Sequence, residues 1–238
     1  MALPFFYIDA YDGSSMLLTL NEETSKHVVQ VLRMQRAEEL NLTDGKGTLL
    51  NAFIVEAHKK NCVVKINTVT KTDEPERKIC IAVSLVKNAS RFEWFLEKAT
   101  EIGVSEIVPL VSERTERQHF RYDRMKGIVI SAMLQSQQIW LPVLHEPVSF
   151  SSYIEQTKEK AQLAKLIAHC EEGTKKSLRD VDLRPFNEIS ILIGPEGDFS
   201  PAEIELALQN KFQPVALGET RLRTETAAVV AATLLAIV

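Results

Sequence analysis

The sequence has little cysteine. Its three cysteines, Cys62, Cys80 and Cys170, are far apart and odd in number, which fits neither a disulfide framework nor the spacing of a zinc site. We expect each to be a small core residue rather than a nucleophile. A reducing, cytoplasmic location is the simplest expectation that follows.

Long apolar runs are also missing. No stretch approaches the roughly 18 to 20 apolar residues that cross a bilayer, and the most apolar segment, residues 227–238, is predicted to be a buried helix. Residues 1–10 carry no positive charge ahead of an apolar run, which differs from a secretion signal. The sequence therefore predicts no membrane partner.

Positive charge is not in excess either. Lysine and arginine number 28 against 32 acidic residues, for a net charge of −4 at pH 7, which argues against binding nucleic acid through bulk charge. A nucleic-acid contact must come from a local basic face, and residues 114–126 are the dense candidate. Glu113, Glu116 and Asp123 dilute that charge, so an ordinary solvated surface explains the segment equally well.

The pattern along the chain predicts two domains, 1–72 and 73–238, joined by a polar stretch over residues 71–78. The first domain is predicted to be a small β-barrel with one helix over residues 24–32. Its expected strands are 5–8, 16–20, 39–42, 48–55 and 62–69. The second alternates strands and helices, which is typical of an α/β domain with a parallel sheet. Its expected strands are 79–86, 107–111, 164–168, 189–193 and 213–217, and its helices 91–102, 121–138, 150–159, 201–210 and 224–238.

The most informative stretch follows the strand 189–193. The chain runs directly into residues 194–199, Gly-Pro-Glu-Gly-Asp-Phe, and Ser200 then begins a helix with Glu203 placed as in a capping box. A turn alone would explain one glycine. Two glycines that flank a proline and a carboxylate favour a ligand-binding loop at the carboxyl end of a parallel strand.

A second loop follows the strand 213–217, beginning at Gly218. Thr224 is a natural N-cap for the last helix and Glu225 favours its dipole, which explains both residues structurally. Arg221 and Arg223 have no such explanation, because cations just before a helix N-terminus oppose its dipole. An anionic partner such as a phosphate accounts for them better.

Several familiar motifs are absent. The chain has no phosphate-loop lysine pattern and no Gly-x-Gly-x-x-Gly, so neither a nucleoside triphosphate nor a dinucleotide is indicated. The five histidines are isolated along the chain, and no metal site is expected. His169 is the histidine of interest, because it ends a third predicted parallel strand.

These residues resemble the RsmE family of 16S rRNA uridine-N3 methyltransferases, within the SPOUT superfamily. The resemblance covers nearly the whole chain in the expected order. Its blocks are residues 26–33, 44–47, 91–92, 97–104, 106–110, 113–114, 194–197, 217–218 and 222–226.

The resemblance implies a PUA-like β-barrel followed by a SPOUT α/β domain with a deep trefoil knot. It also implies a homodimer that uses S-adenosylmethionine without a metal, releases S-adenosylhomocysteine, and methylates 16S rRNA, with the assembled 30S subunit as the expected substrate. The implied cofactor-binding residues are Ala168, His169, Gly194, Pro195, Glu196, Gly197, Leu217, Gly218, Leu222, Thr226 and Ala227.

Two further sets of residues are predicted. Arg114 and Arg223 are expected to hold the target uridine, its phosphate or its developing negative charge, with Glu225 as the candidate base. The RNA-binding set is Lys26, Arg33, Arg36, Lys46, Arg117 and Arg221.

One block departs from the family. The family's middle helix carries Glu, Gln, Ser, a small residue and Arg, whereas residues 134–138 here are Leu, Gln, Ser, Gln and Gln. Contacts made by those missing charges cannot be transferred to this chain. Two other functions stay open at this point, a non-catalytic RNA-binding factor for ribosome assembly and a SPOUT enzyme that acts on tRNA.

Overall fold

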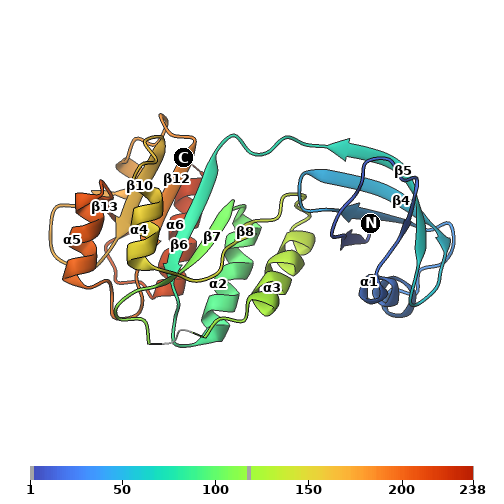
Figure 1. The fold of residues 1–238 in the computed structure, drawn as a ribbon, viewed down its shortest axis with the longest axis horizontal. Helices are drawn as coiled ribbons and strands as arrows, with labels where there is room; N and C mark the ends of the chain where they lie inside the picture. The colour runs from blue at the N-terminus through green and yellow to red at the C-terminus, as the bar shows by residue number, and fades with distance from the viewer. Residues whose placement is uncertain (1–2, 117–118, 238) are drawn as a thin grey trace. The chain divides into compact units, whose positions relative to one another are not determined.

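The computed structural model describes residues 3–116 and 119–237, which form two compact units (Figure 1). The first unit is Met1–Glu74 together with Met133–Leu141, and the second is Pro75–Ala132 with Pro142–Val238. The domain boundary expected after residue 72 lies close to the end of the first stretch. The sequence did not indicate that Met133–Leu141 joins the first unit.

The first unit is built on a five-stranded sheet in the order β1-β3-β4-β5-β2. Strands β1 and β3 pair in parallel, and the other pairs are antiparallel. Within the described residues the edge strands β1 and β2 do not pair with each other, so the expected barrel is a curled half-barrel. The strands are β1 (Phe5–Tyr7), β2 (Leu17–Thr19), β3 (Glu39–Thr43), β4 (Thr48–Glu56) and β5 (Val63–Lys71).

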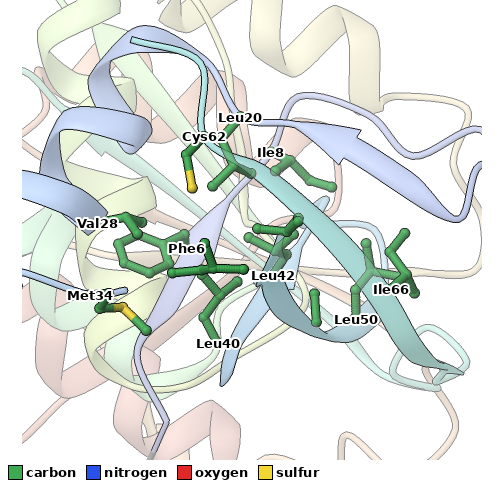
Figure 2. Packing of buried hydrophobic residues seen from close by; sticks show 13 residues of the cluster. Phe6, Ile8, Leu20, Val28, Met34, Leu40, Leu42, Leu50, Cys62 and Ile66 are labelled. Atoms are coloured by element: carbon green, nitrogen blue, oxygen red, sulfur yellow. The ribbon is translucent and has the colours of Figure 1, made fainter. Parts of the chain in front are cut away.

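Alternating burial along β4 shapes this half-barrel. Leu50, Ala52 and Ile54 are fully buried, while the residues between them are partly exposed, as expected of a strand with one face on a core. Figure 2 shows the apolar cluster that they join. Helix α1 (Glu22–Lys26) continues into a π-helix, η1 (His27–Val31), whose Val28 enters the same cluster.

The turn between β3 and β4 is crowded. The Asp44 carboxylate accepts hydrogen bonds from the backbone N–H groups of Lys46 and Thr48 at 2.9 and 3.2 Å, which hold the turn closed. Gly47 has a φ of +83°, and its N–H donates to the Ile139 carbonyl at 2.9 Å. Trp140 pairs with Lys46 in an isolated β-bridge. Residues 139–141 therefore lie directly against this turn.

The second unit is built on an eight-stranded sheet. Its order is β11-β13-β10-β12-β6-β7-β8, with β9 also pairing with β7, and all of these pairs are parallel. The five strands expected from the sequence are confirmed. The others, β8, β9 and β11, are two residues each and too short to leave a pattern. The strands are β6 (Lys78–Ser84), β7 (Glu106–Val111), β8 (Val143–Leu144), β9 (Val148–Ser149), β10 (Leu163–Ala168), β11 (Lys176–Ser177), β12 (Glu188–Ile193) and β13 (Gln213–Ala216).

Helices cover this sheet. Helices α4 and α5 pack together, and their apolar side chains form one core with residues of β6, β7, β10 and β12. Helix α6 packs against α2, β6 and β12. Among the described residues, no helix is long and apolar enough to span a membrane. The helices are α2 (Ala89–Ile102), α3 (Tyr122–Gln135), α4 (Phe150–Thr157), α5 (Pro201–Gln209) and α6 (Thr224–Ala236), with a short 3-10 helix, η2 (Leu178–Asp180).

The substitution Gly47→Ala should destabilise the protein more than Gly13→Ala. Both glycines have a positive φ, but a Cβ at Gly47 would lie 2.5 Å from the Thr72 carbonyl oxygen and 2.5 Å from Trp140 Cζ2, whereas one at Gly13 meets nothing within 4 Å. We expect the unfolding free energy to fall by about 1–3 kcal/mol more for Gly47→Ala, as overpacking typically costs. Urea unfolding of the two variants measures this difference, and equal losses would contradict it.

Candidate functional site

Three parallel strands of the second unit end at the same level. Ala168, the last residue of β10, pairs with Ile193 at the end of β12 and with Val215 near the end of β13. The segments that follow these strands therefore leave the sheet side by side. This edge, outside the carboxyl ends of parallel strands, is where α/β sheets commonly bind ligands.

The loop after β12 is held by its own helix. Ser200 caps α5 by accepting a hydrogen bond from Glu203 N, while Ser200 N donates to Glu203 Oε2 at 2.9 Å, which is the capping box expected from the sequence. Asp198 N donates to the Pro195 carbonyl at 2.9 Å and closes a turn. The loop therefore has a defined shape without any ligand.

Neighbouring loops hold the same segment from outside. Arg114 Nη1 donates to the Gly197 carbonyl at 2.7 Å, and Lys87 N donates to Glu196 Oε1 at 3.0 Å. Glu113 N also donates to Glu203 Oε1 at 2.8 Å. The loops after β6 and β7 thus support the loop after β12.

The segment after β10 contains His169. Lys175 Nζ donates to the His169 carbonyl at 2.8 Å and to the Glu171 carbonyl, which folds this segment back on itself. Both imidazole nitrogens of His169 are buried without a hydrogen-bond partner in the structure as described. Burial, followed by the nearby Lys175 charge, lowers the pKa of the His169 imidazole below its ordinary value. The ring is therefore neutral at pH 7, with one nitrogen able to donate and the other able to accept.

The segment after β13 leads into α6. Arg223 occupies the N-cap position of α6 but makes no side-chain capping bond. Arg221 and Arg223 are exposed, and within the described residues neither side chain has a hydrogen bond or ion pair. Two cationic groups at this helix N-terminus are therefore available to an anion.

The three segments enclose a cavity of about 670 Å³, within the range of roughly 300–1,000 Å³ that is usual for small-molecule sites. No group of three or more His, Cys, Asp or Glu residues that could hold a metal occurs in the described part of the chain. The cavity is lined by Ala168, His169, Cys170, Lys175, Ile193, Gly194, Pro195, Glu196, Asp198, Val215, Ala216, Leu217, Gly218, Glu219, Thr220, Arg221, Leu222, Arg223, Thr224 and Ala227.

Most of the predicted cofactor residues lie on this cavity. Gly197 and Thr226 do not line it, and the remaining members of the predicted set do. Cys170, Lys175 and Asp198 also line the cavity and were not predicted from the sequence. Cys170 and Lys175 follow a predicted strand end, as His169 does, but their spacing carries no motif. Asp198 stands inside the glycine loop and was treated as part of the turn.

The three predicted catalytic residues are separated. Arg223 lines the cavity. Arg114 does not line it and donates to the Gly197 carbonyl instead. Glu225 is 8% exposed, and its Oε1 lies 3.6 Å from Arg91 Nε on α2, while its Oε2 is buried without a partner in the described structure.

The predicted RNA-binding residues lie in both units. Lys26, Arg33, Arg36 and Lys46 are exposed on the first unit. Arg221 lines the cavity of the second unit. Arg117 lies outside the described residues.

The comparison with known proteins identifies the family. The model of the RNA methyltransferase domain matches residues 72–236, and that of the RNA methyltransferase PUA domain matches residues 20–67. A ribosomal RNA small subunit methyltransferase E of Synechocystis sp. (strain ATCC 27184 / PCC 6803 / Kazusa) is 31% identical over 220 residues, which cover 90% of this chain and 71% of that protein. The chain belongs to the ribosomal RNA small subunit methyltransferase E family. The family resemblance expected from the sequence is confirmed.

Solved structures agree with this family. A probable rRNA-methyltransferase from Porphyromonas gingivalis has a TM-score of 0.87 and 39% identity, and the match covers 98% of this chain and 97% of that one. The ribosomal RNA small subunit methyltransferase E of Neisseria gonorrhoeae, solved bound to S-adenosylmethionine, has a TM-score of 0.86 and 30% identity. That match covers 97% of this chain and 95% of the other.

The three cysteines should differ sharply toward a thiol reagent. Cys170 is exposed beside the cavity, contrary to the core position expected for it. Burial raises the pKa of the Cys62 thiol, and it raises that of Cys80, which contacts the Tyr153 hydroxyl at 3.4 Å, to about 12. We expect a disulfide reagent at pH 8 to label Cys170 quickly in the folded protein. Labelling of all three cysteines should be reached only in denaturant. Cys170→Ser should remove the fast reaction; a fast thiol in that variant would contradict this placement.

Proposed function

We propose that this chain transfers the methyl group of S-adenosylmethionine to N3 of a uridine in 16S rRNA, on the assembled 30S subunit, and releases S-adenosylhomocysteine. The observation that carries the proposal is the cavity where three parallel strands end, in a chain of the methyltransferase E family. A relative that is 30% identical over nearly its whole length was solved with S-adenosylmethionine bound.

The cavity fits this cofactor in size and chemistry. The unpartnered nitrogens of His169 supply one donor and one acceptor, which suit a polar heterocycle. A Cβ at Gly218 would meet nothing within 4 Å, so a ligand can approach the backbone there. The residues proposed to hold the cofactor are Ala168, His169, Gly194, Pro195, Glu196, Leu217, Gly218, Leu222 and Ala227, supported by Gly197 and Thr226 behind them. When bound, S-adenosylmethionine supplies an electrophilic methyl group on a sulfonium.

Arg223 and Arg221 are proposed to bind the RNA. Both are exposed cations on the cavity wall, without a partner among the described residues, and their charge adds to the positive end of the α6 dipole. A guanidinium there can hold a phosphate, or stabilise the negative charge that develops when the uridine N3 proton leaves. Much of the remaining rate enhancement must come from alignment, which rigid loops provide.

Arg114 and Glu225 enter the proposal differently. Arg114 is proposed to support the loop after β12 through its hydrogen bond to the Gly197 carbonyl. To contact the substrate as well, it would have to break that bond. Glu225 stays the candidate base for N3. Its Oε2 has no partner within the described structure, but the side chain does not line the cavity, so this role requires the first turn of α6 to rearrange.

The first unit is proposed to bind the RNA around the target. Lys26, Arg33, Arg36 and Lys46 are exposed there and can contact phosphates. Arg33 itself and Ala37, which follows Arg36, have positive φ values of 56° and 74°, and such strain is common at functional loops. The uridine itself must be unstacked to reach a cavity, which fits a structured rRNA site rather than a duplex.

A trefoil knot is part of the proposal. Strand β13 lies between β10 and β11, although both of these precede it in the sequence. The connection that contains β11 and η2 leaves β10 and returns to β12, and η2 contacts α6. This arrangement supports threading of the chain end through that connection. A homodimer is proposed on the family resemblance alone, and a cytoplasmic location on the three scattered cysteines alone.

The activity is tested directly with radiolabelled cofactor. Purified protein should transfer tritium from methyl-labelled S-adenosylmethionine to 30S subunits that lack the modification, and nuclease mapping should find the label on N3 of one uridine. Naked tRNA serves as the control substrate, and no tritium should be transferred to it. Binding of 30S subunits without any transfer would favour a non-catalytic assembly factor and would sink the proposal.

Arg223→Ala should lower methylation of the 30S subunit with little effect on folding. Because the exposed guanidinium is proposed to bind an anion, its removal should lower kcat/KM by about 10- to 100-fold. Arg184→Ala is the matched control, because Arg184 is also exposed, pairs with Asp182 and does not line the cavity. If both variants methylate at the wild-type rate, Arg223 does not contact the RNA.

A further inference from the structure

Asp198 has a backbone conformation that its side chain makes costly. Its φ is +63°, in the left-handed region that glycine adopts freely. Asp tolerates this region better than most L-residues do, but glycine adopts it more freely still. The turn needs only the backbone, since the hydrogen bond that closes it runs from Asp198 N to the Pro195 carbonyl. Glycine would therefore make the same turn, so the turn itself does not require the carboxylate.

The carboxylate connects two of the strand-end segments. Asp198 Oδ1 accepts a hydrogen bond from Phe199 N at 2.8 Å, within its own loop. Asp198 Oδ2 accepts one from Cys170 N at 2.7 Å, in the segment that follows β10. Both bonds are short and charge-assisted, a class about twice as strong as neutral bonds. Asp198 thus ties the loop after β12 to the segment after β10, and both line the cavity.

The tie acts next to a cavity side chain whose buried polar atoms have no hydrogen-bond partner in the described structure. Cys170 directly follows His169, whose ring nitrogens have no partner in the described structure. Lys175 holds the other side of this segment through the His169 carbonyl. Without the Asp198 carboxylate, the Cys170 N–H would lose its acceptor, and among the side chains of the described residues Lys175 would be left to hold the segment. His169 would then lose its fixed position in the cavity wall.

We propose that Asp198 is a positioning residue of the cofactor site, which holds the His169–Cys170 segment in the geometry that binds S-adenosylmethionine. This role rests on the proposed function, since it assumes that the cavity takes the cofactor. Asp198 acts through the two N–H groups rather than through its charge on the ligand. S-adenosylmethionine and S-adenosylhomocysteine, which differ in charge at sulfur, should therefore depend on it equally.

Three variants separate this role from backbone strain. Asp198→Gly relieves the strain and removes both bonds. Asp198→Asn keeps the size and one acceptor oxygen, and Asn tolerates the left-handed region well. Lys211→Gly is the matched control, because Lys211 also has a positive φ, 67°, but is exposed and does not line the cavity.

Calorimetric titration measures binding of both ligands to the full chain, and urea unfolding measures stability. We expect Lys211→Gly to bind as the wild type does. Asp198→Gly should bind S-adenosylmethionine and S-adenosylhomocysteine about tenfold more weakly or worse, as the loss of charge-assisted bonds predicts. The affinity of Asp198→Asn for both ligands should lie between those of Lys211→Gly and Asp198→Gly. Wild-type affinity in Asp198→Gly would overturn the role, and so would weakening of S-adenosylmethionine alone, which would indicate an action of charge.

A second readout needs no ligand. Hydrogen exchange of the Cys170 and Phe199 amides should be faster in Asp198→Gly and Asp198→Asn than in the wild type, while Lys211→Gly leaves both unchanged. Unchanged exchange in the Asp198 variants would overturn the tie even if one variant were too unstable for titration. If the wild type binds neither ligand, the proposed function fails and this role fails with it. If the wild type binds and Asp198→Gly binds equally, only the role fails.

Discussion

The site depends on the register of three parallel strands. Backbone hydrogen bonds place Ala168 opposite Ile193 on one side and Val215 on the other. A shift of one residue in either pairing would point the side chains of that strand to the opposite face. It would also move one strand end away from the other two. The apolar residues of β10, β12 and β13 fix this register by packing, so the cavity is a consequence of the core.

Hydrogen bonds between the loops then give the cavity its detail. Arg114 and Lys87 support the loop after β12 from the neighbouring strand ends, and Asp198 connects it to the segment after β10. Each of these bonds ends on a backbone group. The loops therefore depend partly on Arg114, a side chain that does not line the cavity, and a family match of loop residues alone does not reveal that dependence.

The sequence predicted the elements better than their contacts. Apolar runs located β6, β7, β10, β12 and β13, and the capping residues at Ser200 and Glu203 located the start of α5. Two-residue strands such as β11 have no period to detect. Arg114 looked catalytic because an arginine in a basic segment suggests an anion, whereas the structure gives it a carbonyl partner 83 positions later. Glycine loops indicate where a cavity lies. The sequence pattern does not reveal which carboxylate bonds one loop to the next, as Asp198 does to Cys170 N.

The position of β13 between β10 and β11 also determines when the cavity can exist. All of the residues that line it lie from Ala168 onward, and one wall needs a strand that must enter between two earlier ones. During synthesis on the ribosome, the half-barrel and the first part of the sheet emerge well before that wall. A chain still being made can therefore fold the half-barrel, which is proposed to bind RNA, before the cavity proposed to take the cofactor exists.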